Sequence, residues 1–172
     1  EEADFKIDRE QTAEAFGVVW SAGCTSVVKL LGIKKDQVEP LTWELSETGS
    51  HHDAADYVNA LQTLQRVSRD VARFFLNYDV LLTPTLAEPP VPLGTFDSPP
   101  DNPLKSLDRA GLFIPFTPIC NITGQPAMSV PLFWNSDNLP VGSQFIGRFG
   151  DEGTLFQLAA QLEKARPWDD RR

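Results

Sequence analysis

The side chains that could perform nucleophilic chemistry in this 172-residue chain are its serines and its two cysteines. A serine hydroxyl is a poor nucleophile until a neighbouring base accepts its proton. Ser129 lies in a strand-like run among small residues, but no histidine or lysine is near it in the sequence, and the pattern Gly-x-Ser-x-Gly does not occur. We therefore expect no self-contained serine site, although the fold could still bring a base to Ser129 or to Ser143.

The two histidines, His51 and His52, are adjacent in the sequence. Adjacent residues of a helix point about 100° apart, so this pair lacks the i+3 or i+4 partner that a helical metal site needs. We expect a solvated helix start here, with no metal and no cofactor. Cys24 and Cys120 lie far apart in apolar surroundings, which favours two reduced, core-filling thiols over a disulfide. A role for Cys120 beside a pocket stays open.

The composition is that of a folded protein that does not bind nucleic acid. The net charge of −9 and the pI near 4.6 argue against binding to a phosphate backbone, and the basic end Arg171-Arg172 is too short to change this. By inspection of the sequence, we expect no apolar stretch long enough to span a membrane, and the acidic start Glu1-Glu2 does not resemble a signal peptide. We expect a cytoplasmic protein that folds as one compact unit over residues 1–172.

Helical periodicity and capping residues predict most of the chain's helices. The first has a stripe of Phe16, Trp20, Val27 and Leu31. The last has Asp151 as its cap and Pro167 as its stop. The ranges predicted as helical are Asp8 to Gly32, Leu41 to Glu47, Ser50 to Asn77 with a capping box at Ser50–Asp53, Leu104 to Leu112, and Asp151 to Arg166.

Three runs of residues are typical of strands. They are Asp79 to Thr83, Ala127 to Trp134 and Val141 to Arg148, and the polar loop Asn135–Pro140 between the last two predicts a hairpin. Seven prolines between residues 84 and 103 exclude a regular element there and indicate a functional loop. The residues from Asn121 to Pro126 suit a turn better than a helix.

Three ordered segments of the chain resemble the amidase-signature family of hydrolases. The first is Tyr78-Asp-Val-Leu-Leu-Thr-Pro-Thr85. The second combines Asn121-Ile-Thr-Gly-Gln-Pro-Ala-Met-Ser-Val-Pro131 with Leu139-Pro-Val-Gly-Ser-Gln-Phe-Ile-Gly147, and the third is the closing helix from Glu152 to Glu163. The resemblance implies an α/β fold in which helices flank a mixed β-sheet, as in the C-terminal part of an amidase-signature fold.

The resemblance also implies hydrolysis of an amide by a triad of a serine, a second serine in a cis peptide, and a lysine. In the family these groups lie in a glycine- and serine-rich segment, with the lysine well upstream. The Gly-Ser pairs of this chain are Gly49-Ser50, at a helix boundary, and Gly142-Ser143, at a position that is not catalytic in the family. We therefore assign no catalytic residue and expect the triad in an N-terminal half that acts as the partner of this chain.

Two segments of the resembling enzymes help to shape the substrate cleft: the loop after the first motif and the stretch before the second. The corresponding candidate substrate-binding residues are Pro84, Thr85, Phe116, Thr117, Ile119, Cys120 and Asn121. The implied substrate is a small-molecule amide, and the implied role of the chain is scaffold and cleft wall without activity of its own. Alternatives are a non-catalytic binding module derived from an amidase and part of a glutamine-dependent amidotransferase subunit, and a homo-oligomer also stays open.

Overall fold

A computed structural model describes residues 1–169, so the Arg171-Arg172 pair lies outside the described residues. The chain divides into two compact units. The sheet unit contains Glu1–Phe5, Asp70–Pro92 and the chain from Leu112 onward, and the helical unit contains Lys6–Arg69 and Leu93–Gly111. The buried apolar residues of the sheet unit include Val130, Phe145 and Leu155, and those of the helical unit include Ala15, Val28 and Leu45. Folding of residues 1–172 as one compact unit stays a prediction.

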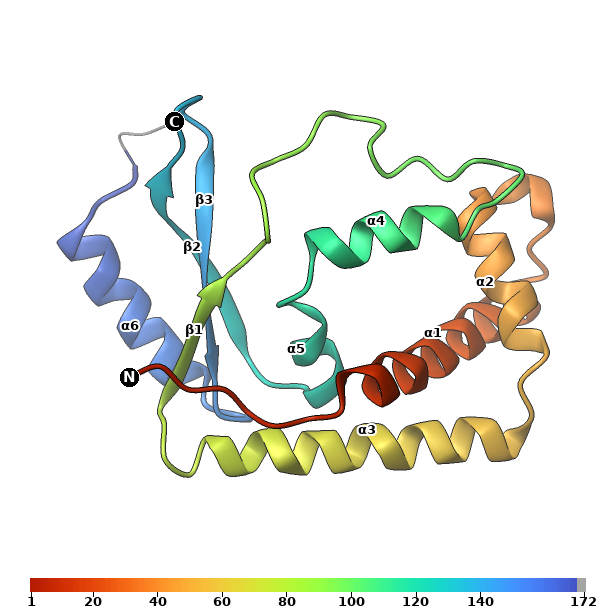
Figure 1. Cartoon of the computed structure of the whole chain (residues 1–172), viewed down its shortest axis with the longest axis horizontal. Coiled ribbons are helices and arrows are strands. Elements are labelled where there is room, and N and C mark those ends of the chain that lie inside the picture. Colours follow the sequence, from red (N-terminus) through yellow and green to blue (C-terminus); the bar gives the residue numbers. More distant parts are fainter. Residues whose placement is uncertain (170–172) are drawn as a thin grey trace. The chain divides into compact units, whose positions relative to one another are not determined.

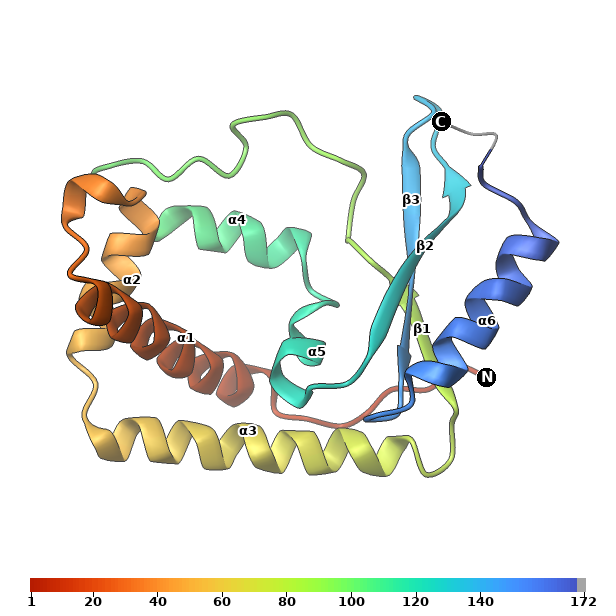
Figure 2. The ribbon, with the colours of Figure 1, turned by 180° about the vertical axis from the view of Figure 1, so that it is seen from behind.

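The sheet unit is built on three strands, β1 (Val80–Pro84), β2 (Ala127–Trp134) and β3 (Pro140–Gly147), in the order β1-β3-β2 (Figure 1). Both pairings are antiparallel, so the mixture of strand directions expected from the sequence does not occur among the described residues. Helix α6 (Glu152–Ala165) packs beside β2 and β3 (Figure 2). The core between them contains Val130, Phe145 and Leu155, and the α/β class predicted from the sequence is confirmed.

The hairpin between β2 and β3 forms where the polar loop predicted it. The side chain of Asn135 accepts hydrogen bonds from the backbone N–H groups of Asp137 (3.0 Å) and Leu139 (2.8 Å). Asn138 adopts a left-handed conformation with φ 59°, which asparagine tolerates better than most residues. The loop residues therefore fix the turn and the pairing of Phe133 and Trp134 with β3. A register shift between Pro131 and Phe133 then sets the pairing of the rest of β2.

A short helix, α5 (Pro118–Thr123), covers the first three residues of the segment from Asn121 to Pro126 that was predicted to be a turn. That expectation was wrong because Pro118 takes the first helical position, where a missing backbone N–H costs nothing. Gly124 ends the helix in a left-handed conformation with φ 70°. Helix α4 (Lys105–Phe113) precedes it, close to the predicted range, and no helix or strand lies between Pro84 and Lys105 in the described chain.

In the helical unit, α1 (Arg9–Leu31) packs against α2 (Pro40–Ser50). Asp8 and Gly32 cap α1 as predicted. The face of α1 that is buried carries small and polar side chains, whereas the predicted apolar stripe is largely uncovered. The buried residues are Thr12, Ala15, Ser21, Thr25 and Val28, and the exposed ones include Trp20 (41%), Val27 (51%), Leu30 (82%) and Leu31 (66%).

The two helices approach closely because Gly49 of α2 has no side chain. A Cβ atom at residue 49 would lie 2.1 Å from the carbonyl oxygen of Ser21 and 2.5 Å from the Thr25 hydroxyl. The Thr25 hydroxyl donates to the Ser46 carbonyl (2.6 Å), so a buried polar group is satisfied across the contact. Gly49 was expected to end this helix. It lies inside α2 instead, because the helix continues to Ser50.

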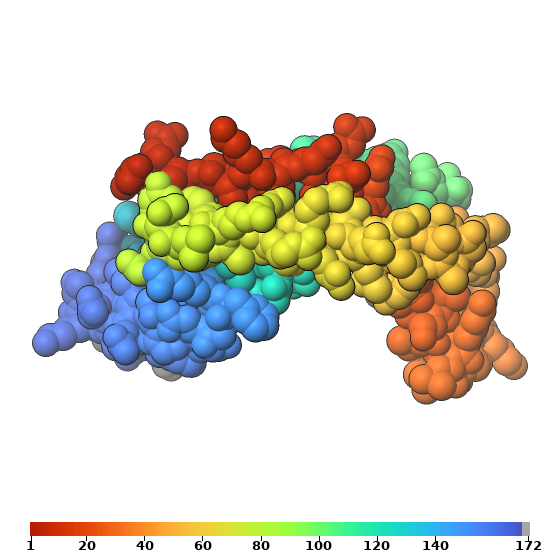
Figure 3. Space-filling model, turned by 90° about the horizontal axis from the view of Figure 1, so that it is seen from below, coloured from red at the N-terminus to blue at the C-terminus, as the bar shows by residue number. Residues whose placement is uncertain are grey.

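Helix α3 (Ala54–Phe74) begins with a reciprocal cap at Asp53. The backbone N–H of Asp56 donates to the Asp53 carboxylate (2.9 Å), and the N–H of Asp53 donates to the Asp56 carboxylate (3.0 Å). The box predicted at Ser50 was therefore displaced by three residues, because Ser50 still belongs to α2. The start of α1 runs along α3 (Figure 3), where Arg66 donates to the side chain of Gln11 (3.0 Å).

Helix α1 is also long and apolar enough to cross a membrane, judged by length and composition. The prediction that no apolar stretch is long enough to span a membrane was therefore wrong. Core helices of soluble proteins meet the same criterion, but only 22% of the apolar window of α1 is buried within the described chain. The expected cytoplasmic setting stays a prediction.

Candidate functional site

Hydroxyl and amide side chains gather on one face of the sheet. Gln144 of β3 lies opposite Thr83 of β1 and opposite Ser129 of β2 in the strand register. Residues directly opposite each other in antiparallel strands project to the same face, so these three side chains form one row across the sheet. Thr85 follows immediately after β1 and joins them. We refer to Thr83, Thr85, Ser129 and Gln144 as the polar row.

The hydroxyl groups of Thr85 and Ser129 are 2.6 Å apart, which is a short hydrogen bond. They meet over Gly142 of β3, whose backbone carbonyl accepts a hydrogen bond from the Thr85 N–H (3.0 Å). A Cβ atom at residue 142 would lie 2.6 Å from each of the two hydroxyl oxygens. The pair can therefore form only because residue 142 lacks a side chain.

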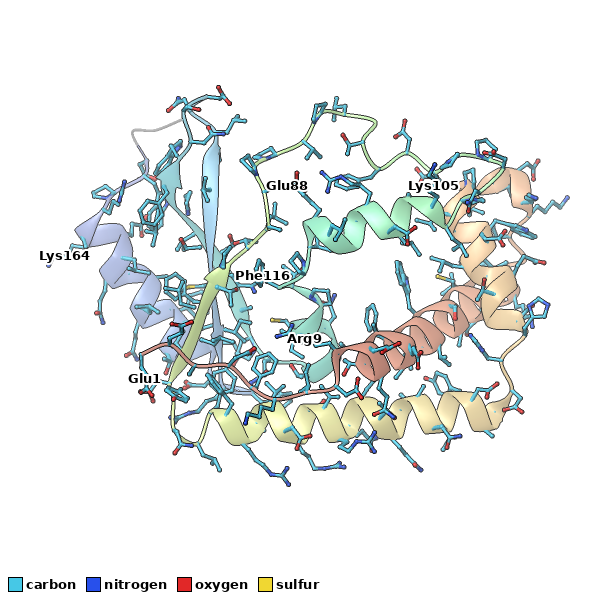
Figure 4. All side chains as sticks on the ribbon, viewed as in Figure 1. Glu1, Arg9, Glu88, Lys105, Phe116 and Lys164 are labelled. Atoms are coloured by element: carbon cyan, nitrogen blue, oxygen red, sulfur yellow. The ribbon has the colours of Figure 1, made fainter. Side chains whose placement is uncertain are left out.

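Gln144 is the buried member of the polar row, with 4% of its surface exposed. Its side-chain nitrogen donates to the Thr83 hydroxyl (3.1 Å) and to the backbone carbonyl of Phe116 (3.1 Å). Both hydrogens of the amide are thus used, which removes the penalty of burying an unsatisfied donor. Through this side chain the sheet is joined to the segment between α4 and α5, where Phe116 lies near the end of β1 (Figure 4).

The polar row contains one of the predicted substrate-binding residues and contacts another. Thr85 belongs to the row, and Phe116 is bound to it through its carbonyl group. Pro84 is exposed at the end of β1. It lies between Thr83 and Thr85 in the sequence, so its side chain projects to the opposite face of the sheet from the polar row. That any of these residues contacts a substrate stays a prediction.

The other four predicted residues lie at α5 and are not hydrogen-bonded to the polar row among the described residues. Thr117 precedes the helix, and the carbonyl of Ile119 accepts a hydrogen bond from the Thr123 hydroxyl (2.8 Å). Cys120 is half-buried, whereas Asn121 is exposed. The structure thus separates the predicted set into residues at the sheet and residues on the short helix that follows Phe116.

Sequence reasoning did not identify Thr83 and Gln144 as site residues, and it considered Ser129 only as a nucleophile. The available signal was the alternation of polar residues in runs that were predicted to be strands. This alternation places Thr83 and Thr85 on one face of their segment, but it does not reveal which residue of another strand lies opposite. That information depends on the pairing of β1 with β3, which are about 60 residues apart in the sequence.

The polar row can bind and orient a polar group, but it holds no base. The partner of the Ser129 hydroxyl is another hydroxyl, and no lysine or histidine is hydrogen-bonded to it within residues 1–169. A serine without a proton acceptor stays a weak nucleophile. His51, at the end of α2, instead contacts the Glu47 carbonyl through its ring nitrogen (2.8 Å), and residues 1–169 contain no cluster of three metal-binding side chains.

Burial raises the pKa of the Cys120 thiol above its ordinary value of 9.0. The reactive thiolate is therefore scarcer in the folded chain than in the unfolded chain at the same pH. We expect iodoacetamide to modify Cys120 at pH 8 about tenfold more slowly in the native chain than in urea, as measured by peptide mass spectrometry. Equal rates would contradict the burial. Because the folded state retains this proton, the free energy of unfolding is expected to fall as the pH rises above the ordinary thiol pKa of 9.0.

Comparison with known proteins identifies the family to which the chain is similar. Residues 26–156 match the sequence model of the family described as Amidase. AmiC of Mycobacterium leprae is 44% identical over 109 residues, which cover 63% of this chain and 23% of AmiC. The 6-aminohexanoate-cyclic-dimer hydrolase of Paenarthrobacter ureafaciens is 30% identical over 146 residues, covering 81% of this chain and 30% of the hydrolase. The chain thus spans less than a third of the length of these relatives.

Solved structures give the same result for the fold. A 6-aminohexanoate cyclic dimer hydrolase in complex with its substrate superimposes with a TM-score of 0.82 at 28% identity, covering 96% of this chain and 36% of the hydrolase. A bacterial aryl acylamidase of the amidase signature family superimposes with a TM-score of 0.75 at 20% identity, covering 99% of this chain and 37% of the acylamidase. With the family model matching about three quarters of its residues, the chain belongs to the Amidase family.

Proposed function

We propose that this chain is the C-terminal portion of an amidase that hydrolyses a carbon–nitrogen bond of a small-molecule carboxamide. In this proposal it supplies scaffold and part of the substrate cleft, while the Ser-Ser-Lys triad lies in an N-terminal part of the same enzyme. The observation that carries the proposal is the Amidase family match over residues 26–156 in a chain that spans 23% to 30% of two curated relatives.

The exposed apolar face of α1 supports a partner of this kind. Val27, Leu30 and Leu31 are 51%, 82% and 66% exposed and lie within about one turn of the helix, and Trp20 lies two turns earlier. A contiguous apolar patch of this kind usually marks an interface in a soluble protein. The occupant that we propose is the N-terminal part of the enzyme, because the relatives are about three to four times longer than their aligned regions.

The polar row supports a role in binding a carboxamide. An amide group has one acceptor oxygen and N–H donors, and hydroxyl and amide side chains can pair with either. Thr85 and Ser129 present two hydroxyl groups at the end of β1, on the face of the sheet that carries Gln144. Since no base accompanies them, these residues would orient the substrate while the partner supplies the nucleophile.

Ammonia release from benzamide and from acetamide tests the proposed activity. We expect the full-length polypeptide, with its N-terminal part, to release ammonia, and this chain alone to release none above background. Turnover by the chain alone that survives Ser129→Ala and Ser143→Ala would show that neither serine is its nucleophile and would contradict the division of labour proposed here. A full-length polypeptide that hydrolyses neither amide nor any homologous carboxamide would contradict the function itself.

A charge on the exposed face of α1 is expected to weaken binding of the N-terminal part. Leu30→Glu should reduce the affinity at least about tenfold, because it places a carboxylate in a desolvated interface. The isolated chain should fold normally, since Leu30 is 82% exposed within it. The matched control is Leu93→Glu, in the proline-rich loop, where the side chain is fully exposed. Calorimetric titration measures both, and equal affinities would contradict the proposed docking face.

A further inference from the structure

Gln144 joins two segments that contain predicted substrate-binding residues: the end of β1 and the segment around Phe116. On one side its amide holds Thr83, which immediately precedes Pro84 and Thr85. On the other side it holds the carbonyl of Phe116, in a segment without regular structure between α4 and α5. One buried side chain therefore fixes the spacing between the end of β1 and the segment that leads into α5.

A second hydrogen bond joins the chain just after β1 to the last residue of α4, which leads into the segment that contains Phe116. The backbone N–H of Ala87 donates to the Phe113 carbonyl (3.0 Å), three residues before Phe116. This bond lies in an exposed part of the chain, whereas Gln144 is 4% exposed. Hydrogen bonds shielded from water are harder to replace, so the link through Gln144 should determine the position of the segment.

We propose that Gln144 is a positioning residue for substrate binding, which sets the distance between the wall at Pro84–Thr85 and the wall at Phe116–Thr117. This inference rests on the proposed amidase function and deepens it. The side chain of Gln144 is nearly inaccessible and does not itself contact the substrate. Its replacement should therefore change how well an amide fits more than how fast the bound amide reacts.

The test compares Gln144→Met, which keeps the length of the side chain but removes both donors, with Gln125→Met. Gln125 is a matched control because it is also buried (7% exposed), and its side-chain oxygen accepts a hydrogen bond from Thr123, only two residues away. Gln144→Asn, whose shorter amide cannot span both partners, serves as a milder second variant. It decides the question if the methionine variant does not fold.

Hydrogen exchange of backbone N–H groups in the isolated chain tests whether Gln144 holds the two segments together. In Gln144→Met the Ala87 N–H should exchange at least about tenfold faster, because the segment that contains its acceptor is released. The N–H of Gly147, which donates to the Pro126 carbonyl (2.9 Å) beside the sheet, should keep its protection. Unchanged exchange at Ala87, or equal loss of protection at both positions, would overturn the positioning role.

Kinetics on the full-length polypeptide complete the test. We expect Gln144→Met to raise the KM for benzamide about tenfold with kcat changed less than about threefold, while Gln125→Met changes neither. Normal kinetics in Gln144→Met would overturn the inference even if the exchange differs. If the unmodified full-length polypeptide hydrolyses no carboxamide, both the proposed function and the assignment of the cleft walls are wrong. If it is active and the Gln144 variants behave as the wild type does, the proposed function stands and the inference about Gln144 is wrong.

Discussion

Adding one methyl group at residue 49 is expected to lower the free energy of unfolding by about 3 kcal/mol. In Gly49→Ala the new Cβ would lie 2.1 Å from the Ser21 carbonyl oxygen, a backbone atom that cannot rotate away. Helices α1 and α2 must therefore separate. Their separation also lengthens the 2.6 Å hydrogen bond from Thr25 to the Ser46 carbonyl, which leaves the Thr25 hydroxyl with the Ser21 carbonyl of its own helix as acceptor.

Thermal unfolding followed by circular dichroism measures this effect, which should lower Tm by about 6–12 °C for a chain of this size. Gly23→Ala is the control, since Gly23 lies in α1 and a Cβ atom added there would have no neighbouring atom within 4 Å. Alanine is the better helix former, so this variant should gain about 0.5–1 kcal/mol. If both variants behave alike, the close contact at Gly49 is not a determinant of the packing of α1 on α2.

A side chain at residue 142 should damage the polar row in the same way. In Gly142→Ala the Cβ would lie 2.6 Å from the hydroxyl oxygens of Thr85 and Ser129, and 3.0 Å from the Thr85 Cβ. The two hydroxyl groups can rotate away only by breaking the hydrogen bond between them, and the Thr85 Cβ cannot move without its backbone. We expect a loss of about 2–3 kcal/mol in the free energy of unfolding, measured by urea denaturation.

Removing the hydroxyl groups provides the diagnostic control. In a chain that carries Thr85→Ala and Ser129→Ala, the further change Gly142→Ala should cost less than about 1 kcal/mol, because the two nearest atoms are gone. Gly153→Ala in α6, where the nearest atom is 4.0 Å from the Cβ position, should leave stability unchanged or slightly raised. An undiminished cost in the double-alanine background would mean that the strain at Gly142 has another origin.

The elements that the sequence predicted best are those whose signals are local. Asp8 and Gly32 cap α1, and Asp151 caps α6, because a side-chain acceptor or a left-handed glycine acts within one turn of the helix it limits. The β2–β3 hairpin was predicted for the same reason, since the loop that joins the strands carries its turn signal. A register shift between Pro131 and Phe133, which has no signal in the loop, sets the pairing of the rest of β2.

The predictions for the start of α3 and for the buried face of α1 were wrong for a common reason. In both places the sequence contains two competing local signals, and tertiary packing decides between them. Ser50 and Asp53 can both begin a helix, but the packing of α2 on α1 through Gly49 keeps Ser50 in the preceding helix. The apolar stripe on α1 suggested a face buried within this chain. The structure buries the opposite face, with Ser21 and Thr25, because small residues allow a close approach to α2.

The candidate site could be predicted only in part. Thr85 and Phe116 were identified through the family resemblance, whereas the contribution of Gln144 required the nonlocal pairing of β1 with β3. The role of Gly142 was equally hidden, because a glycine in a strand gives no indication of which side chains fill the space above it. The residues that position the proposed walls are therefore the ones that single-sequence reasoning could not find.

The most direct test of the proposed division of labour is complementation between two separately purified parts of the enzyme, the N-terminal part and this chain, followed by ammonia release from benzamide. We predict no turnover by either part alone, turnover on mixing, and loss of that turnover when the chain carries Leu30→Glu but not Leu93→Glu. Turnover by this chain alone would contradict the proposal. So would an inactive mixture of two folded parts whose intact parent polypeptide is active.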